Sequence, residues 1–251
     1  MIERGWRDQN IFVISLIEDK RAIPVSWQII SKRGCSNLAE QKALIRPVIQ
    51  LFKGYQLLLL GDREFHSIKL ANWLHAKKVS FVLRQKQGTY IRQDNQPYRQ
   101  LKTLGLRPGI SYFYQELNVT KQKGFGRFNM AGYYPRKYRG KVEPSGWHLL
   151  TNLSSLDATI IAFKRRSGIE AMFKDCKTGG TALGGFADLK QVPCGYNLES
   201  THTSEQRLLA LILLIAIAYS CAVSSGRQVR QMRLQKYVGK VTRIKTLSST
   251  A

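Results

Sequence analysis

A short apolar strand that ends in a carboxylate, followed by a helix and a second strand, constrains the fold of this chain most. Residues 57–60 are four leucines in a row, and Gly61 and Asp62 follow them directly. Residues 67–77 then carry apolar side chains at helical spacing, and residues 79–83 form another apolar run. This pattern predicts a β-α-β unit with strands buried on both faces. Ligands of open α/β sheets bind beyond the carboxyl ends of strands, where Asp62 lies. Asp62 fits a turn or helix cap equally well.

The segments before this unit predict a hairpin and a helix. Residues 11–17 and 22–30 are rich in β-branched and aromatic side chains, and the charged residues 18–21 separate them. Two such runs joined by a short turn indicate antiparallel strands. Residues 37–52 have apolar side chains at helical spacing. Together with the β-α-β unit, these elements predict a mixed α/β sheet flanked by helices.

The second half of the chain divides into an insertion, two helices and a tail. Residues 84–155 lack helical periodicity and contain short alternating runs at 111–119 and 146–151, which predicts a basic, mainly β insertion. We therefore expect a core in two parts, 1–83 and 156–225, interrupted by that insertion and followed by a basic tail at 226–251. Within the second part, the apolar run 208–223 is short for a membrane span, and we expect a buried helix.

Four side chains that suit a metal-bound phosphodiester recur along residues 157–177, which we expect to form one helix. At about 100° per residue, Phe163, Arg166, Glu170 and Lys177 fall within roughly 60° of one another. The carboxylate can bind a hard divalent metal ion. The positively charged side chains of Arg166 and Lys177 can bind phosphate oxygens, and the aromatic ring can pack beside a nucleotide. The alternative is an ordinary solvated helix face in which Arg166 and Glu170 form an i,i+4 ion pair.

An apolar stripe on the same helix favours a site at the edge of the core. Its members, spaced i, i+3, i+4 and i+7, are Ile169, Met172, Phe173 and Cys176. The centre of this stripe lies about 100° around the helix from the polar side chains. The polar stripe should therefore border the core.

The charge of the chain points to a polyanionic partner. Its 251 residues contain 40 Lys and Arg against 16 Asp and Glu, a formal net charge of +24. Residues 84–141 hold 13 basic side chains against Asp94 and Glu116 alone, and residues 226–251 hold seven against no acid. Nucleic acid is the leading candidate, with binding that weakens as salt rises.

Several other classes of protein are not supported. The four cysteines show no Cys-x-x-Cys spacing and the four histidines are scattered, so neither a zinc site nor a disulfide framework is indicated. Reduced thiols and a start without signal-peptide features favour a cytoplasmic protein. We expect no membrane partner.

The spacing of these residues resembles the bacterial DDE transposases of the insertion-sequence-4-like branch. The block Gly61-Asp62-Arg63-Glu64-Phe65 is followed about a hundred residues later by Phe163, Arg166, Glu170 and Lys177. The last catalytic block of that family is Tyr-x2-Arg-x3-Glu-x6-Lys, so three of four residues match and Phe163 replaces the Tyr. This substitution keeps the ring and removes a hydroxyl donor.

The resemblance implies a fold, a chemistry and a role for each residue. The family fold is ribonuclease H-like, with a mainly β insertion between the second and third catalytic carboxylates. The family activity is metal-dependent DNA cleavage and strand transfer. By resemblance, Asp62 and Glu170 are catalytic and bind Mg²⁺ or Mn²⁺ in a two-ion site. Arg166 and Lys177 hold phosphate, and Phe163 packs beside the DNA. Double-stranded DNA, as transposon ends and target, is the expected partner of a bacterial, nucleoid-associated protein that forms a homodimer in the DNA complex.

The first catalytic carboxylate of the family has no counterpart in its usual place. Its Asp commonly precedes a Trp by four positions, and matching that Trp to Trp6 places Ile2 in the Asp position. Glu3 should point to the other face of the strand, and Asp8 lies about 20 Å further along it. We expect an amino-terminally truncated transposase that lacks its first catalytic carboxylate. The alternatives are a non-catalytic DNA-binding remnant and a ribonuclease H-like nuclease without strand transfer.

Overall fold

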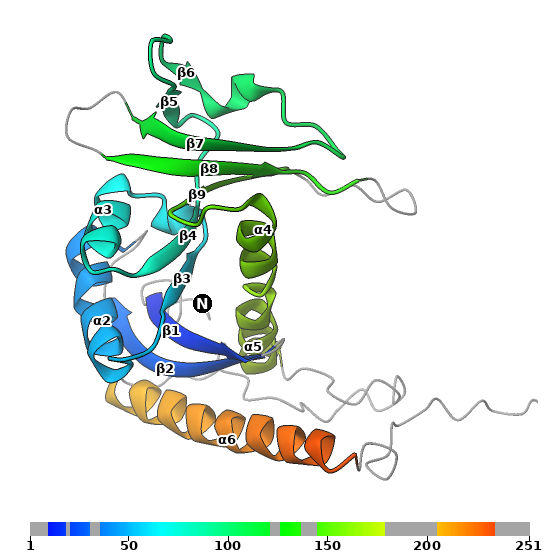
Figure 1. The fold of residues 1–251 in the computed structure, drawn as a ribbon. Coiled ribbons are helices and arrows are strands. Elements are labelled where there is room, and N and C mark those ends of the chain that lie inside the picture. Colours follow the sequence, from blue (N-terminus) through cyan, green and yellow to red (C-terminus); the bar gives the residue numbers. More distant parts are fainter. Residues whose placement is uncertain are drawn as a thin grey trace, which may run out of the picture. The chain divides into compact units, whose positions relative to one another are not determined.

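The structure, a computed structural model, divides into two compact units. It describes residues 10–18, 21–30, 36–120, 126–136, 145–178 and 205–233. The hairpin–helix unit consists of Met1–Gly34 and Ser167–Ala251, and the sheet unit of Cys35–Arg166. Figure 1 shows their elements, and each unit is described here by itself. This division differs from the predicted one, because residues 84–155 share a unit with residues 35–83.

The predicted hairpin is present in the hairpin–helix unit. Strand β1 (Asn10–Glu18) pairs antiparallel with β2 (Arg21–Ile30). The register shifts between Ile14 and Ser15, where Ser15 faces Pro24. Proline has no backbone N–H to donate, so an irregularity in the ladder is expected beside it.

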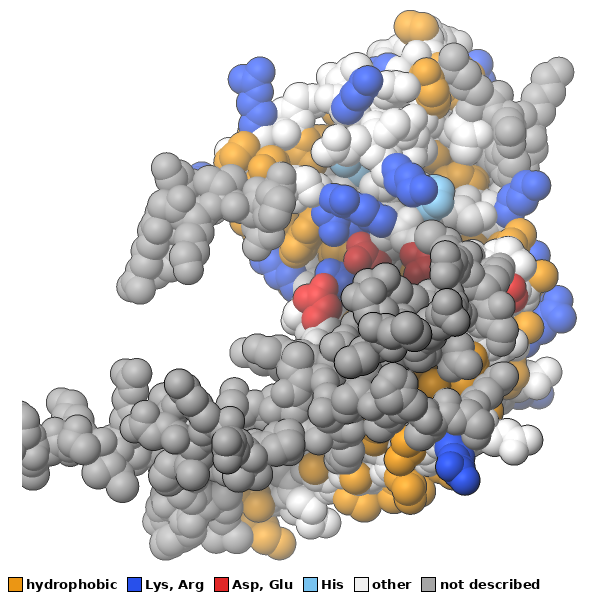
Figure 2. Space-filling model, turned by 180° about the vertical axis from the view of Figure 1, so that it is seen from behind, with side chains coloured by type: hydrophobic (Ala, Val, Ile, Leu, Met, Phe, Trp, Pro, Cys, Tyr) orange, Lys and Arg blue, Asp and Glu red, His pale blue; other side chains and the backbone are white. Residues whose placement is uncertain are grey.

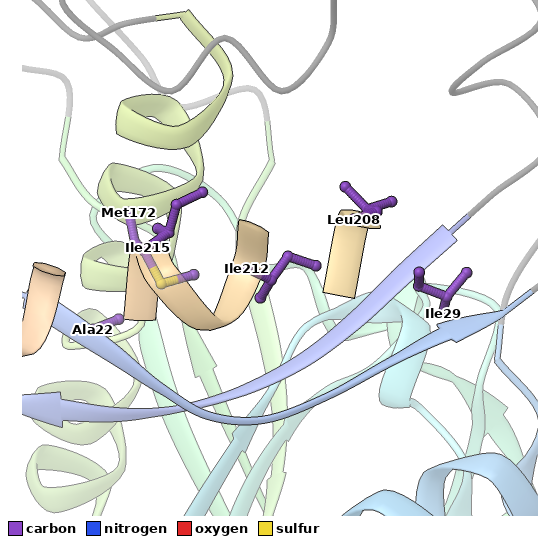
Figure 3. Close-up of a cluster of buried hydrophobic side chains, with 6 residues drawn as sticks. All are labelled: Ala22, Ile29, Met172, Leu208, Ile212 and Ile215. Carbon is purple, nitrogen blue, oxygen red and sulfur yellow. The ribbon is translucent and has the colours of Figure 1, made fainter. Parts of the chain in front are cut away.

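Two helices pack on this hairpin. Helix α5 (Ser167–Thr178) contributes Met172, and α6 (Glu205–Gln231) contributes three side chains one or two turns apart. They meet the hairpin in a buried cluster, drawn in Figure 3, of Ala22, Ile29, Met172, Leu208, Ile212 and Ile215. Ile169 and Phe173 pack against the same cluster, which confirms the predicted apolar stripe of α5 for these residues.

Helix α6 is longer than predicted and only one of its faces is buried. Leu213, Leu214 and Ile217 are 49%, 61% and 53% exposed. Exposed hydrophobic side chains, coloured orange, are visible near the bottom of Figure 2. The prediction of a buried helix is therefore wrong for this face. By length and composition alone, residues 206–231 could cross a membrane, a test that core helices of soluble proteins also pass. Near its end, Arg227 bonds Glu18 of β1 at 2.8 Å.

The sheet unit starts with a well-capped helix. Helix α2 (Leu38–Leu51) follows Asn37, whose side chain accepts a hydrogen bond from the backbone N–H of Glu40. The Glu40 carboxylate accepts one from the backbone N–H of Asn37 at 2.7 Å. This reciprocal capping box satisfies two backbone donors at the helix start.

The predicted β-α-β unit follows. Strands β3 (Leu58–Gly61) and β4 (Ser80–Arg84) are parallel, and α3 (Ile68–Ala76) connects them. Among the described strands β3 lies at the edge of its sheet, and Leu58 is 42% exposed. The expectation that β3 is buried on both faces is therefore wrong, whereas the interior residues of β4 are buried.

The strands of the predicted insertion extend the same sheet. The order of the seven strands is β3-β4-β9-β8-β7-β5-β6. The last five are β5 (Tyr90–Arg92), β6 (Arg99–Gln100), β7 (Ser111–Val119), β8 (Arg127–Tyr133) and β9 (Trp147–Thr151). Because β9 pairs antiparallel with β4, these residues do not form a separate β domain.

Helices cover both faces of this sheet. On one face, helix α4 (Leu156–Lys164) packs Ala162 and Phe163 against Val82, Ala131 and Leu149. The other face carries Phe81, whose ring meets Phe128 at 5.3 Å, and Phe128 in turn meets His75 of α3 at 5.9 Å. Neighbouring residues of a strand point to opposite faces, so Val82 and Phe81 place α4 and α3 on opposite sides. The fold is a mixed α/β sheet between helices (Figure 1).

Candidate active site

Asp62 and Arg84 lie together because Asp62 directly follows β3 and Arg84 is the last residue of β4, the parallel strand beside it. Gly61, the last residue of β3, pairs with Leu83 of β4. The next residue of each chain segment is Asp62 and Arg84, so both reach the same edge of the sheet. Arg84 Nη1 lies 3.5 Å from Asp62 Oδ1. The predicted place of Asp62, beyond the carboxyl end of a strand, is confirmed.

Gly61 allows the tight turn that orients Asp62. A Cβ atom at position 61 would lie 2.7 Å from Cβ of Phe65 and 2.8 Å from Cδ2 of Leu83. These contacts are shorter than van der Waals separation, so the turn packs on β4 only when residue 61 has no side chain. The backbone N–H of Phe65 donates to the Asp62 carbonyl at 2.8 Å, which closes the short 3₁₀ turn Arg63–Phe65.

Arg166, 104 residues later in the chain, also binds Asp62. Its Nη1 donates to Asp62 Oδ2 at 3.4 Å. The side chains of Arg84 and Arg166 are 13% and 18% exposed, whereas that of Asp62 is 44% exposed. The two guanidinium groups are therefore mostly buried, and the Asp62 side chain beside them is partly exposed although its Oδ1 atom is buried.

A third guanidinium joins this group through a serine. Ser145 Oγ accepts hydrogen bonds from Arg63 Nη2 at 2.7 Å and from Arg84 Nη2 at 3.1 Å. Burial lowers the pKa of Arg84 below its usual range, and the charges of Arg63 and Arg166 lower it further, while Asp62 opposes them. Three guanidinium groups around one carboxylate carry excess positive charge, which favours an anion such as phosphate.

Glu64, the other acid of the Gly61–Phe65 block, has a local partner. Its Oε1 accepts from the backbone N–H and from Oγ of Ser36, each at 2.8 Å. Ser36 lies just before the capping residue of α2. Glu64 therefore ties the turn after β3 to the start of α2.

The predicted single helix over residues 157–177 is two helices. Helix α4 ends at Lys164 and α5 begins at Ser167. The N–H groups of Arg165 and Arg166 bond the carbonyls of Ala162 and Phe163, each at 3.1 Å and three residues back. Such i→i−3 bonds tighten and end a helix. The prediction that Phe163, Arg166, Glu170 and Lys177 lie on one stripe assumed a single continuous helix. That assumption does not hold, because the first two residues belong to the end of α4 and the last two to α5.

Phe163 lies in the core rather than on a polar face. Its side chain is 1% exposed, and its ring meets that of Trp147 at 5.1 Å. The Arg166 guanidinium lies 5.3 Å from the ring centre of Phe163. The ring is therefore not accessible to DNA in this structure, which differs from the prediction that it packs beside a DNA strand. It supports Arg166 instead.

The remaining predicted residues belong elsewhere. Glu170 is an exposed residue of α5 in the hairpin–helix unit, and Lys177 lies on the same helix with a side chain outside the described part. Ile2, Glu3 and Asp8 precede the described residues. Within one unit, the structure thus brings together Asp62 and Arg166 of the predicted set.

Asp62 is the side chain of this group that could bind a metal. Carboxylate oxygen is the donor that Mg²⁺ prefers, and proteins commonly bind Mg²⁺ through one or two carboxylates completed by water and substrate phosphates. Within the described ranges, no three His, Cys, Asp or Glu side chains gather as a metal site. Asp62 fits Mg²⁺ in donor type and needs further ligands from outside this group.

Sequence reasoning missed Arg84 and Ser145. The rule that singled out Asp62, a polar residue after a buried strand, applies equally to Arg84 after residues 79–83. Ser145 has no comparable signal, because its role depends on the pairing of β9 with β4. Figure 2 shows Lys and Arg side chains beside a few acidic ones on the face in view.

Comparison with known families identifies the class of protein. The family model described as "Transposase DDE domain" matches residues 19–182, which is more than half of the chain. The chain therefore belongs to the DDE transposase domain family. No curated protein matches it.

Among solved structures, the chain is similar to the piggyBac transposase in its synaptic complex with hairpin DNA. The two share 15% sequence identity with a TM-score of 0.47, over 86% of this chain and 41% of that chain. The chain thus spans less than half the length of that transposase.

Proposed function

We propose that this DDE transposase domain catalyses metal-dependent cleavage and strand transfer of DNA during insertion-sequence transposition. The observation that carries the proposal is the 3.4 Å contact between Arg166 and Asp62. It joins two sequence blocks 104 residues apart, each of which suits phosphodiester chemistry. A ribonuclease H-like core and the insertion-sequence-4-like branch are part of this proposal, and the amino-terminal truncation stays a prediction.

Each residue has a proposed role. Asp62 and Glu170 hold Mg²⁺ or Mn²⁺, and Arg166 and Lys177 bind phosphate oxygens. When bound, two such ions activate the attacking oxygen and stabilise the leaving one. Phe163 orients Arg166. The burial of the Phe163 ring supports this role better than contact with DNA. The first carboxylate has no assigned residue.

The positive charges of Arg84 and Arg166 also affect how a metal ion would bind at Asp62. Both lie within 3.5 Å of the Asp62 carboxylate. A divalent cation at Asp62 is repelled by these guanidinium groups unless an anion accompanies it. We therefore expect metal and DNA phosphate to bind together, with the phosphate accepting the hydrogen bond that Arg166 donates to the carboxylate in this structure.

A nicking assay tests the proposal. The wild-type protein should nick supercoiled plasmid DNA in Mg²⁺ or Mn²⁺ and not in a chelator. Asp62→Asn and Glu170→Gln should each lower the rate by about a hundredfold or more, since ion positioning supplies much of the catalysis. Asp94→Asn is the matched control, because Asp94 is an exposed acid of the sheet unit paired with Arg127 at 2.6 Å. Metal-independent cleavage, or full activity in Asp62→Asn, would contradict the assignment.

A non-catalytic DNA-binding remnant is the second candidate. The net charge of +24 and Ile2 in the position of the first Asp favour it. It predicts salt-sensitive DNA binding without nicking in either metal, and cleavage restored by Ile2→Asp would argue for the catalytic function. A ribonuclease H-like nuclease would nick and fail to join a donor end to target DNA.

The proposed partners follow from the same chemistry. We propose double-stranded DNA, both transposon ends and target, with a homodimer in the DNA complex. The expected location is the bacterial cytoplasm, in association with the nucleoid.

A further inference from the structure

The hydroxyl oxygen of Ser145 accepts hydrogen bonds from two positively charged side chains. The hydroxyl accepts from Arg63 Nη2 and Arg84 Nη2 at 2.7 and 3.1 Å. A serine hydroxyl has two lone pairs and can accept both bonds at once. Two guanidinium groups repel each other, so a neutral hydroxyl between them fixes their positions without cancelling their charge. A carboxylate at this position would have neutralised the pair.

The backbone around Ser145 is fixed by packing. Trp147, two residues on, pairs with Tyr133 of β8. At Gly146 a Cβ atom would lie 2.6 Å from Cδ2 of Leu106 and 3.0 Å from Cδ1 of Tyr134. The backbone at position 146 therefore packs closely against both side chains, and Ser145 is held at the start of β9.

The two arginines differ in what they leave available. Arg84 is largely buried and uses Nη1 on Asp62 and Nη2 on Ser145. Arg63 is exposed, and Ser145 is its only side-chain partner within the described part of the chain. Its Nη1 and Nε groups can therefore donate to a ligand that approaches from solvent. An anion at this point would offset the repulsion between the two guanidinium groups that meet at Ser145.

We propose that Ser145 is a positioning residue that holds Arg63 and Arg84 as a pair to bind a phosphate group of the DNA strand beside Asp62. The proposal rests on the proposed function for the identity of the ligand as DNA. Arg63 supplies the solvent-facing donors and Arg84 the buried charge. Ser145 contacts no reacting atom and acts through both.

Binding of inorganic phosphate, measured by calorimetry at neutral pH, tests the pair directly. Wild-type protein should bind phosphate. Arg63→Gln should weaken binding roughly tenfold, and Ser145→Ala should weaken it about threefold to tenfold. Ser145→Thr keeps the hydroxyl and should restore binding to within about twofold of wild type. Arg127→Gln removes an arginine that pairs with Asp94 and should leave binding unchanged.

A double variant separates positioning from general structure. If Ser145 acts through Arg63, Ser145→Ala should have little further effect in an Arg63→Gln background, because the effects of coupled residues are not additive. Circular dichroism confirms that each variant is folded. Should Ser145→Ala fail to fold, Ser145→Cys, which keeps the size and replaces the hydroxyl by a weak acceptor, serves instead.

The outcomes distinguish this inference from the proposed function. Phosphate binding requires neither metal nor cleavage, so a wild-type protein that binds phosphate in this pattern and never nicks DNA contradicts the function alone. A wild-type protein that nicks DNA, with phosphate affinity unchanged by Ser145→Ala, overturns the positioning role. Absence of phosphate binding in the wild type overturns it as well.

Discussion

At the scale of single residues, the surroundings of Asp62 combine opposite requirements. Its carboxylate forms ion pairs with Arg84 and Arg166, and the side chain remains 44% exposed. Arg63 and Arg84 meet at Ser145. Such an arrangement is a poor contribution to stability, because buried like charges repel. It suits a site that is completed by a metal ion and a phosphate.

Gly61→Ala should destabilise the sheet unit and displace Asp62. Its new Cβ would lie 2.7 and 2.8 Å from Phe65 and Leu83, and relief requires movement of the turn or of β4. We expect a loss of about 1–3 kcal/mol in the free energy of unfolding, together with weaker nicking. Gly88→Ala is the control, since its Cβ would meet nothing within 4 Å. Equal stability of the two variants in urea denaturation would refute the steric argument.

His148 should make stability depend on pH. Its ring shares a 2.7 Å hydrogen bond with the Tyr112 hydroxyl, and burial, with the charge of Arg84, lowers the pKa of His148 to about 4. The unfolded chain binds this proton below about pH 6.5 and the folded chain only near pH 4. Stability from this group is therefore complete above pH 6.5 and is lost as the pH falls toward 4, by about 3 kcal/mol at most.

Urea denaturation between pH 4 and 7 measures this effect. His148→Gln keeps an acceptor for Tyr112 and does not titrate, so its stability should fall less over this range than that of the wild type. Identical pH dependence of the two proteins would show that another group is responsible.

At the scale of elements, the break between α4 and α5 changes what the last block can do. Arg165 and Arg166 are good helix formers, so propensity alone predicts continuation. The chain instead closes α4 with i→i−3 bonds and starts α5 at Ser167, just before Gly168. Arg166 is thereby placed at the end of α4, where it reaches Asp62. The weak signal for this break was the Ser-Gly pair.

Neighbouring residues of α6 should respond very differently to truncation. Ile212 is 6% exposed in the cluster with the hairpin, whereas Leu213 is 49% exposed. Ile212→Ala should lower the free energy of unfolding by about 2–4 kcal/mol, because it leaves a cavity. Leu213→Ala should cost less than about 1 kcal/mol. Urea unfolding followed by circular dichroism compares them, and similar losses would mean that both faces of α6 are covered.

At the scale of the whole molecule, the net charge of +24 should govern the proposed association with DNA. Each phosphate neutralised by Lys or Arg releases a counterion, so the logarithm of the affinity falls linearly with the logarithm of the salt concentration. Between 50 and 200 mM salt we expect at least about a thousandfold loss of affinity if six or more phosphates are contacted. Fluorescence anisotropy with a labelled duplex measures it. An affinity that does not change with salt would exclude a mainly electrostatic interface.

Much of the fold could be predicted from local patterns. The hairpin, α2, the β-α-β unit and the apolar stripe of α5 all follow from periodicity, since each pattern reports which side of an element is buried. Periodicity did not show that β9 joins β4, that β3 is an edge strand or that one face of α6 is exposed. Those features depend on which elements become neighbours.

The candidate site divides in the same way. Asp62 was predictable because a polar residue directly after a short apolar run is a local signal, and Arg166 because its spacing resembles a family block. The burial of Phe163 against Trp147 was not, because both residues fit a surface or a core equally well by sequence. The roles of Arg84 and Ser145 depend on contacts between segments more than sixty residues apart.

The sequence by itself determined the class of most elements, the excess of positive charge and the presence of side chains whose chemistry suits a phosphodiester. These properties belong to side-chain chemistry and to backbone periods of two and 3.6 residues. Only the tertiary structure decided which charges meet. Parallel pairing of β3 with β4 placed Asp62 beside Arg84, the end of α4 added Arg166, and the start of β9 brought Ser145 to both Arg63 and Arg84. Distances between residues far apart in the chain follow from packing, which no local pattern contains.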